Sequence, residues 1–199
     1  MSGSDRIERI LGFLETLDRF KSVYRAAYLT DGSRNESDAE HSWHLAMYAL
    51  LLHEGTGLEV DLGRTLELIL VHDLVEIYAG DTPLHGLEGH EDKQARESAA
   101  ADRLFATLPT DVERAIRERW QEFENGESPE ARFAGALDRL QAFAQNVFTA
   151  GRVWRHYRVT EDVSRSRNER AMNLDPSLRE IFEALYERAA RDRMWHEGA

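Results

Sequence analysis

Apolar residues recur at helical spacing through most of the chain, and this pattern limits the possible folds more than any other feature. In residues 5–24, Ile7, Leu11 and Leu14 repeat at intervals of three or four residues, as on one face of a helix. No stretch alternates between apolar and polar residues for long enough to predict a strand. We therefore expect an all-α fold in which residues 1–199 form a single helical domain.

Helix-start signals show where several of these helices begin. Ser37 and Glu40 have the spacing of a capping box, and Asp61 can cap a helix that Gly80 would end. Similar signals open later helices at Thr110 with Glu113, Ser128-Pro129, Thr160 and Asp175-Pro176. Residues 80–90 contain three glycines and a proline, which predicts a surface loop between helices.

The composition excludes several classes of function. The 199-residue chain has a formal net charge of −12, whereas nucleic-acid polymers are bound through clustered Lys and Arg. It has no cysteine, so any metal must be held by nitrogen and oxygen ligands. No run approaches the ~20 apolar residues that a membrane span needs. The first residues lack the pattern of a secretion signal, so we expect a cytoplasmic protein without membrane association.

A histidine and an aspartate, His72 and Asp73, stand inside an apolar helical run. Burying an unpaired charge there would be costly, and a divalent metal shared with His41 and Asp138 could satisfy all four groups. Without further signals, a His-Asp pair on a helix is more often a simple hydrogen-bonded pair. Glu76 lies four residues after His72 and three after Asp73, so it can share their face of the helix.

Five short motifs occur in a fixed order along most of the chain. They are Ala39-Glu40-His41, Val71-His72-Asp73-Leu74-Val75-Glu76, Gly80-Asp81-Thr82-Pro83, Pro129-Glu130-Ala131-Arg132-Phe133 and Leu137-Asp138-Arg139-Leu140. In order and separation they resemble the HD-domain superfamily of metal-dependent phosphohydrolases, and within it the small helical proteins similar to bacterial 5'-deoxynucleotidases. The resemblance covers about residues 10–150. It implies a helical HD-domain bundle on which helices within residues 160–195 pack.

The resemblance also implies a centre for one divalent metal ion. The family's four metal ligands are matched by His41, His72, Asp73 and Asp138. His44 is a competing neighbour of His41, which we assign to packing around the site. Imidazole and carboxylate ligands suit Mn, Co, Fe, Ni, Zn or Mg and leave positions for water and phosphate. Such an ion polarises a phosphoryl oxygen and lowers the pKa of a bound water, which favours attack on a phosphate ester.

Catalytic and substrate-binding residues follow from the same resemblance. Glu76 and Asp81 match acidic positions that look catalytic, with Glu76 as water activator, although Asp81 could equally be a turn residue of the loop. Arg25 matches an arginine near the substrate phosphate, although its position also suits a helix C-terminus, and Lys93 is a weaker candidate. The nucleotidases carry an aromatic residue close to that arginine. Preference for deoxyribose is in doubt unless Tyr28 takes its place.

These inferences predict a phosphohydrolase that cleaves a small phosphate monoester by attack of a metal-activated water. The best single guess for its substrate is a (deoxy)nucleoside 5'-monophosphate. A cyclic-nucleotide or alarmone phosphodiesterase of the same superfamily is one alternative. It lacks support because a second metal would need loop histidines such as His85 and His90, which usually face solvent. Another alternative is a non-catalytic module in which the metal holds helices together and the pocket senses a nucleotide. We also expect a homodimer, as is frequent in this branch.

Overall fold

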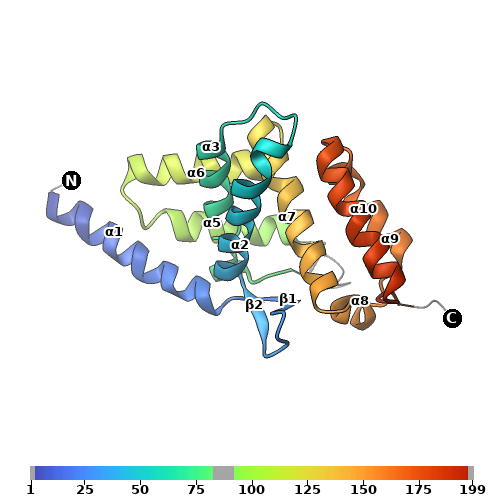
Figure 1. Cartoon of the computed structure of the whole chain (residues 1–199). Coiled ribbons are helices and arrows are strands. Elements are labelled where there is room, and N and C mark those ends of the chain that lie inside the picture. Colours follow the sequence, from blue (N-terminus) through green and yellow to red (C-terminus); the bar gives the residue numbers. More distant parts are fainter. Residues whose placement is uncertain (1–2, 83–91, 197–199) are drawn as a thin grey trace.

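The computed structural model describes residues 3–82 and 92–196, which fold mainly into helices (Figure 1). The helices are α1 Gly3–Leu17, α2 Asp38–Leu52, α3 Leu62–Val71, α4 Glu76–Ala79, α5 Lys93–Phe105, α6 Thr110–Asn125, α7 Pro129–Phe148, α8 Arg152–His156, α9 Glu161–Met172 and α10 Pro176–Arg191. The shorter elements are the 3-10 helices η1 Asp18–Ser22 and η2 His53–Gly55 and the strands β1 Tyr24–Tyr28 and β2 Asn35–Ser37. The predicted helical fold class is confirmed. The structure also contains a minor pair of strands that the sequence did not predict.

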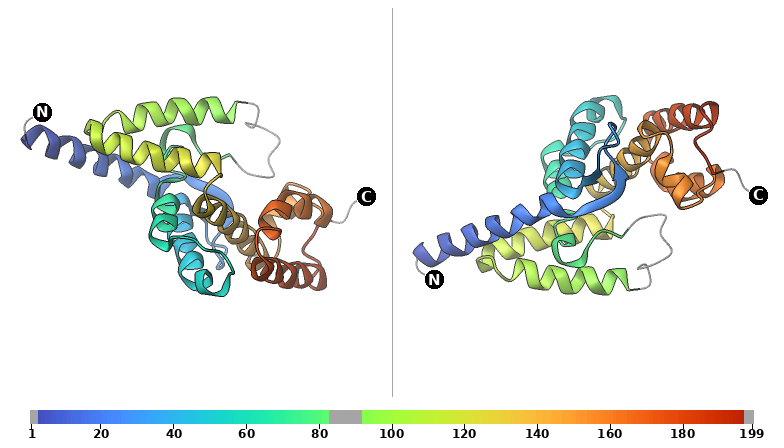
Figure 2. Two further views of the ribbon diagram at one scale, coloured as in Figure 1. Left: turned by 90° about the horizontal axis from the view of Figure 1, so that it is seen from above. Right: turned by 90° about the horizontal axis from the view of Figure 1, so that it is seen from below.

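Helix α7 lies at the centre of the molecule, between the pair α2 and α3 and the pair α9 and α10 (Figures 1 and 2). Its side chains Phe133, Leu137 and Leu140 are fully buried in the main apolar core. Near its end, the Phe143 ring lies 4.4 Å from the Tyr186 ring of α10, measured between ring centres. Aromatic packing therefore attaches the C-terminal helices to the side of α7 that faces away from α2 and α3.

A second apolar cluster joins α1 to α5 and α6 and includes Phe13, Leu104, Phe105 and Trp120. Polar contacts support this arrangement, because the Arg6 guanidinium lies 2.6 Å from the Asp111 carboxylate of α6. The loop predicted for residues 80–90 connects α4 to α5. Its residues 83–90, with both loop histidines, lie outside the described residues.

Most predicted helix starts are confirmed. The capping box of Ser37 is complete, since its Oγ accepts from the Glu40 amide and the Glu40 carboxylate accepts from the Ser37 amide. Side-chain caps are also present at Asp61, Ser128, Thr160 and Asp175. The capping box predicted for Thr110 is wrong. Pro109 takes the cap position with extended backbone, so Thr110 is already the first helical residue and its side chain caps nothing.

The end of the first predicted helix differs from expectation. The helix predicted through residue 24 ends at Leu17, and the chain continues through η1 into β1. β1 pairs antiparallel with β2, with Tyr24 opposite Ser37 and Tyr28 opposite Asn35. The Asn35 amide donates to the carbonyl of Arg25 at 2.8 Å and to that of Ala26 at 3.1 Å. The strands are too short for a visible alternation, and pairing across the hairpin stabilises them.

The helix predicted to run from Asp61 to Gly80 is divided into α3 and α4. α3 ends at Val71, and a turn over residues 72–75 precedes α4. The His72 side chain lies 2.7 Å from the Ile69 carbonyl through Nδ1 and so takes an acceptor that the helix backbone would otherwise use. Gly80 ends α4 with φ +76, a backbone conformation that favours glycine. The turn places His72, Asp73 and Glu76 differently from a straight helix.

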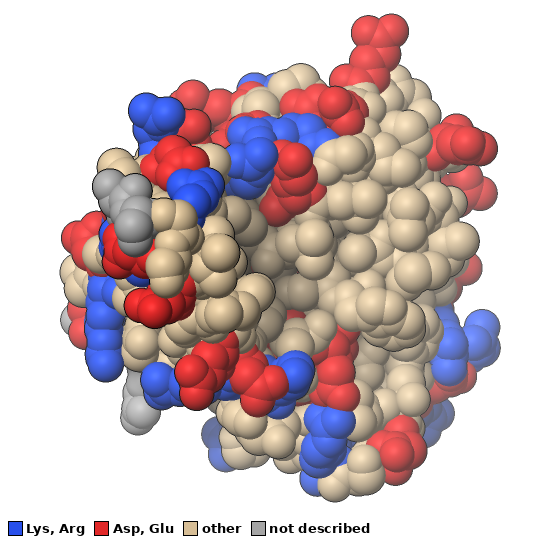
Figure 3. Space-filling model, turned by 90° about the vertical axis from the view of Figure 1, so that its left-hand side faces the viewer, with Lys and Arg blue, Asp and Glu red and all other residues tan. Residues whose placement is uncertain are grey.

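Some apolar side chains remain exposed on the first helices. Ile7, Leu11 and Leu14 follow one face of α1, and Leu51 and Leu70 are exposed on α2 and α3. Figure 3 shows one side of the molecule, where uncharged residues form a broad area around a hollow and charged side chains lie along its border. Exposed apolar side chains such as those of Leu11, Leu51 and Leu70 often mark an interaction site when they are contiguous, and the homodimer stays a prediction. No helix in the described segments is long and apolar enough to span a bilayer.

Candidate metal centre

Two histidines and two aspartates from three separate segments meet in the interior. His41 lies in the first turn of α2, His72 and Asp73 follow α3, and Asp138 lies on α7. His72 Nε2 is 2.9 Å from Asp73 Oδ2, and His41 Nε2 is 3.1 Å from Asp138 Oδ1 and 3.9 Å from Asp73 Oδ2. The structure thus brings together all four residues that the sequence proposed as metal ligands. We refer to them as the His–Asp cluster.

The two imidazoles are oriented for metal binding. His41 Nδ1 lies 2.7 Å from Gln141 Oε1, and His72 Nδ1 lies 2.7 Å from the Ile69 carbonyl oxygen. Because both partners are acceptors, the proton of each neutral ring is on Nδ1, and Nε2 carries the free lone pair. Both Nε2 atoms are buried and have no hydrogen-bond partner among the described residues. Buried ring nitrogens that make no hydrogen bond but lie 2.9 and 3.1 Å from carboxylate oxygens fit a divalent cation with nitrogen and oxygen ligands.

The electrostatics of the cluster favour positive charge at its centre. Burial lowers the pKa of the His72 imidazole, but the carboxylates of Asp73 and Asp138 outweigh it and raise that pKa to about 9. Burial acts to raise the pKa of Asp73, yet His72 and Arg25 hold it well below its usual range. The pKa of Asp138 is also lowered, against the effect of burial, by the His41 and His72 rings. Both carboxyl groups are therefore available as charged ligands.

Arg25 reaches the cluster from β1, so it is not the helix-terminal arginine that the sequence left as an alternative. Its Nη1 lies 2.7 Å from Asp73 Oδ2 and 3.3 Å from Asp38 Oδ1, and its Nη2 lies 4.0 Å from Asp138 Oδ1. The hairpin thus places a guanidinium directly beside two of the candidate metal ligands. A planar guanidinium in this position can also bind the oxygens of a phosphate.

Three further carboxyl groups, of Asp38, Glu76 and Asp81, lie next to the His–Asp cluster, with one oxygen of each within 4.8 Å of the others. Burial and the Asp73 carboxylate raise the pKa of Asp38 to about 7, against the effect of Arg25. Burial, Asp73 and Asp38 raise the pKa of Glu76 to about 12. Asp38 Oδ2 and Glu76 Oε2 are buried without a hydrogen-bond partner within the described segments. This group therefore favours protons or positive charge among its oxygens.

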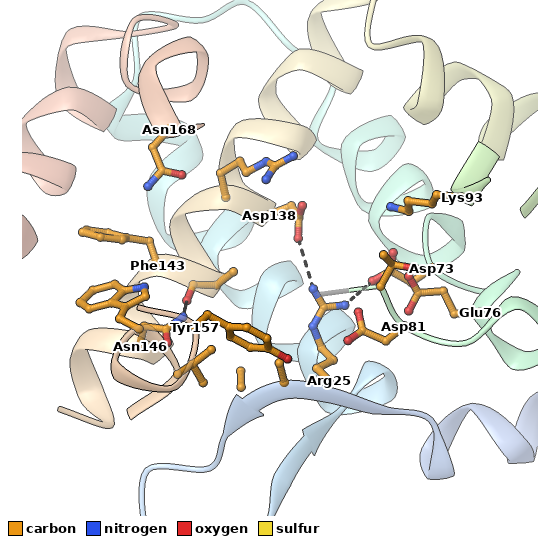
Figure 4. A pocket seen from close by; sticks show the side chains of 17 residues that line it. Arg25, Asp73, Glu76, Asp81, Lys93, Asp138, Phe143, Asn146, Tyr157 and Asn168 are labelled. Carbon is orange, nitrogen blue, oxygen red and sulfur yellow. Dashed lines mark hydrogen bonds and ion pairs between the residues drawn. The ribbon is translucent and has the colours of Figure 1, made fainter. Parts of the chain in front are cut away.

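A cavity of about 340 Å³ begins at these charged groups and extends along α7. Figure 4 shows Arg25, Asp73, Glu76, Asp81 and Lys93 at one end, which we call the charged end. Phe143, Asn146, Tyr157 and Asn168 lie at the other, which we call the aromatic end, with Asp138 between the two. The volume lies within the range of roughly 300–1,000 Å³ that is typical of small-molecule sites.

Of the remaining predicted residues, Lys93 and Asp81 line the cavity and Tyr28 does not. Lys93, the first residue of α5, lines the charged end with its Nζ 3.3 Å from the Glu97 carboxylate. Asp81 also lines it, and burial raises the pKa of its carboxyl group, against the effect of Arg25. Tyr28 is not brought to the cavity, because its ring packs under the guanidinium of Arg152 at 3.5 Å. The aromatic residues that line the cavity are instead Phe143, Trp154 and Tyr157.

Sequence reasoning missed several residues of the site. Asp38 lies three residues before His41 on α2, and this spacing is the signal that could have indicated it. Arg139 follows Asp138 and lines the cavity, with no ion pair or hydrogen bond to any residue in the described ranges. His44 lies 3.2 Å from Gln141 Nε2, so it contacts the residue that holds His41 and stays apart from the cluster. No local signal in the sequence indicates the aromatic end.

The fold and the His–Asp cluster match a known class of protein. The chain belongs to the HD domain family, whose model matches residues 17–179. It is related to proteins named 5'-deoxynucleotidases. One is the 5'-deoxynucleotidase HDDC2 of Bos taurus, which is 30% identical over 137 residues, covering 68% of this chain and 65% of that protein. Another is the 5'-deoxynucleotidase hdd1 of Schizosaccharomyces pombe, 29% identical over 141 residues, covering 68% of this chain and 70% of that protein.

A solved structure matches more of the molecule. The crystal structure of a protein described as a predicted metal-dependent phosphohydrolase, from Magnetospirillum magnetotacticum MS-1, is 40% identical. It covers 97% of both chains with a TM-score of 0.90, so the likeness includes α8 to α10. By contrast, this chain spans slightly less than two thirds of the bovine nucleotidase, 65% of its length.

Proposed function

We propose that this protein is a divalent-metal-dependent phosphohydrolase that cleaves a (deoxy)nucleoside 5'-monophosphate into a nucleoside and phosphate. The observation that carries the proposal is the pair of buried Nε2 atoms of His41 and His72. They make no hydrogen bond within the described segments and lie 3.1 and 2.9 Å from two carboxylates at one end of a cavity of suitable size. The relatives named 5'-deoxynucleotidases support the substrate class.

The charged end provides groups for binding the phosphate. A divalent cation held by the His–Asp cluster supplies Lewis acidity toward a phosphoryl oxygen and lowers the pKa of water. Arg25 and Lys93 line the same end of the cavity and can bind the remaining phosphate oxygens. Because Arg25 is already paired with Asp73 at 2.7 Å, its guanidinium is held in place before the substrate arrives.

Proton transfer is assigned to Glu76 and Asp81. In the hydrolysis, a bond forms between phosphorus and the oxygen of water, and the bond between phosphorus and the 5' oxygen breaks. A cation in the His–Asp cluster would offset the negative charge of Asp73, which raises the pKa of Glu76, and would so favour the ionised Glu76 carboxylate. In that state Glu76 would take the proton that water loses, and the Asp81 carboxyl group, whose pKa is raised by burial, would give a proton to the departing 5' oxygen. Both side chains line the charged end beside Asp73, where these atoms must lie.

The experiment is phosphate release from a panel of nucleoside monophosphates, sugar phosphates and cyclic nucleotides with several added divalent ions, together with elemental analysis of the purified protein. We expect release from 5'-monophosphates that depends on the metal. The Glu76→Gln variant should retain its metal content and lose turnover. Absence of phosphate release from every monoester with every ion would overturn the proposal, and an active Glu76→Gln variant would overturn the role of Glu76.

A further inference from the structure

The aromatic end of the cavity is built by a different part of the chain from the charged end. Phe143 and Asn146 come from the last turns of α7, Trp154 and Tyr157 from α8 and the residue after it, and Asn168 from α9. In Figure 4, Phe143, Asn146 and Asn168 lie on the opposite side of the cavity from Glu76 and Lys93, and the Tyr157 ring extends from that side toward Arg25. A ligand with its phosphate at the charged end therefore extends toward aromatic rings and two side-chain amides.

Asn168 is held rigidly and has an unused acceptor. Its Nδ2 donates to the Tyr186 hydroxyl at 3.1 Å and lies 3.5 Å from Ser164 Oγ. The side chain is 4% exposed, yet Oδ1 accepts no hydrogen bond from any residue in the described segments. In Figure 4 this oxygen points into the cavity. Because this oxygen faces the cavity and accepts no hydrogen bond within the described segments, it can accept one from a ligand there.

We propose that the aromatic end binds the nucleobase and that Asn168 Oδ1 accepts a hydrogen bond from a base N–H group. A base is the part of a nucleotide that combines a flat aromatic surface with N–H donors. The walls of the aromatic end offer aromatic rings for the first and a hydrogen-bond acceptor for the second. Tyr157 and Trp154 provide the apolar contact, and Asn168 provides the polar one. The inference rests on the proposed function for the identity of the ligand, and it makes Asn168 a residue that determines specificity.

The test separates base recognition from phosphate chemistry by using the four common 2'-deoxynucleosides, which carry no phosphate. Their binding to the full-length parent and to the Asn168→Leu variant is measured by calorimetry. The matched control is Ser164→Ala, because Ser164 belongs to the same buried hydrogen-bond group as Asn168 but does not line the cavity. In Asn168→Leu, the Tyr186 hydroxyl and Ser164 can still bond each other at 3.1 Å. A second variant, Tyr157→Ala, removes the half-buried aromatic wall instead.

We expect at least one deoxynucleoside to bind the parent and Ser164→Ala equally. Binding to Asn168→Leu and to Tyr157→Ala should be weaker by about tenfold, the scale of one lost hydrogen bond or aromatic contact. In turnover assays, Asn168→Leu should lower kcat/KM for nucleotides and leave that for 2-deoxyribose 5-phosphate unchanged. The inference is overturned if no nucleoside binds, if Asn168→Leu binds as the parent does, or if Ser164→Ala is weakened equally. Nucleoside binding without any phosphate release would instead refute the proposed function alone.

Discussion

The Gln141 side chain of α7 and the His41 ring of α2 are joined by a buried contact of 2.7 Å between Oε1 and Nδ1. The amide nitrogen of the same Gln141 donates to Glu36 Oε1 at 3.0 Å, so the amide cannot turn without breaking that bond. This arrangement sets the tautomer of His41 and directs Nε2 toward the carboxylates. Gln141 is therefore a positioning residue for the candidate metal centre.

The Gln141→Leu variant should bind a divalent metal more weakly. Residues that orient a metal-binding histidine typically contribute 10–100-fold to metal affinity, and we expect a loss in that range. Equilibrium dialysis with Mn²⁺, followed by elemental analysis, measures the change. Gln121→Leu on the exposed surface of α6 is the control and should bind as the parent does. Unchanged affinity in Gln141→Leu would contradict the positioning role.

Metal binding should also stabilise the fold. A cation that binds only the folded chain raises the unfolding free energy by about 2.7 kcal/mol when its concentration is 100 times its Kd. We expect chelator treatment to lower the Tm of the parent and added metal to restore it. The His72→Ala variant, which lacks one buried ligand, should show little of this response in thermal unfolding followed by circular dichroism. An equal metal response in both proteins would argue against the His–Asp cluster.

Arg25→Gln should separate metal binding from phosphate chemistry. The positive charge of Arg25 lies 2.7 Å from Asp73 and opposes a cation there, so the variant should bind metal at least as tightly as the parent. Turnover of a phosphate ester should fall by roughly 10²–10³-fold, the scale for losing a preorganised donor. Metal content and kcat/KM are measured on the same preparation. Arg34→Gln, an exposed position of the same hairpin that pairs with Glu40, is the control.

Two glycine-to-alanine substitutions should have opposite effects on stability. Gly151, between α7 and α8, has φ +68, and a Cβ there would lie 2.3 Å from the Met194 carbonyl oxygen. Gly151→Ala should lower the unfolding free energy by about 2 kcal/mol or more, because the backbone is strained and the contact cannot relax easily. Gly135 in α7 has no atom within 4 Å of a built Cβ, so Gly135→Ala should raise it by up to about 1 kcal/mol. Urea unfolding of both variants measures the contrast.

Local signals were sufficient to predict most helices. Ser37, Asp61 and Ser128 act within their own turn, so their sequence context predicts the helix start. The hairpin was missed because its stability depends on pairing and on Asn35 bonding across to Arg25, ten residues away in sequence. The break after α3 was missed because it depends on a bond made by the His72 side chain.

The candidate metal ligands could be proposed from sequence because they occur within recognisable motifs around His41, His72 and Asp138. Asp38 was missed although its helical spacing from His41 is regular. The aromatic end could not be inferred, since it depends on how α8 and α9 pack against α7. Tyr157 and Asn168 meet the cavity only through that packing, which no local pattern specifies.

The division of the cavity between two parts of the chain has a practical consequence. The residues proposed to hold the metal and phosphate lie within 25–138, whereas the rings and amides at the opposite end lie within 143–168. If the proposed function holds, a library of variants restricted to the second stretch should change which leaving group is accepted while the proposed hydrolytic residues stay intact. We therefore expect ligand selectivity and bond cleavage to be separately adjustable in this protein.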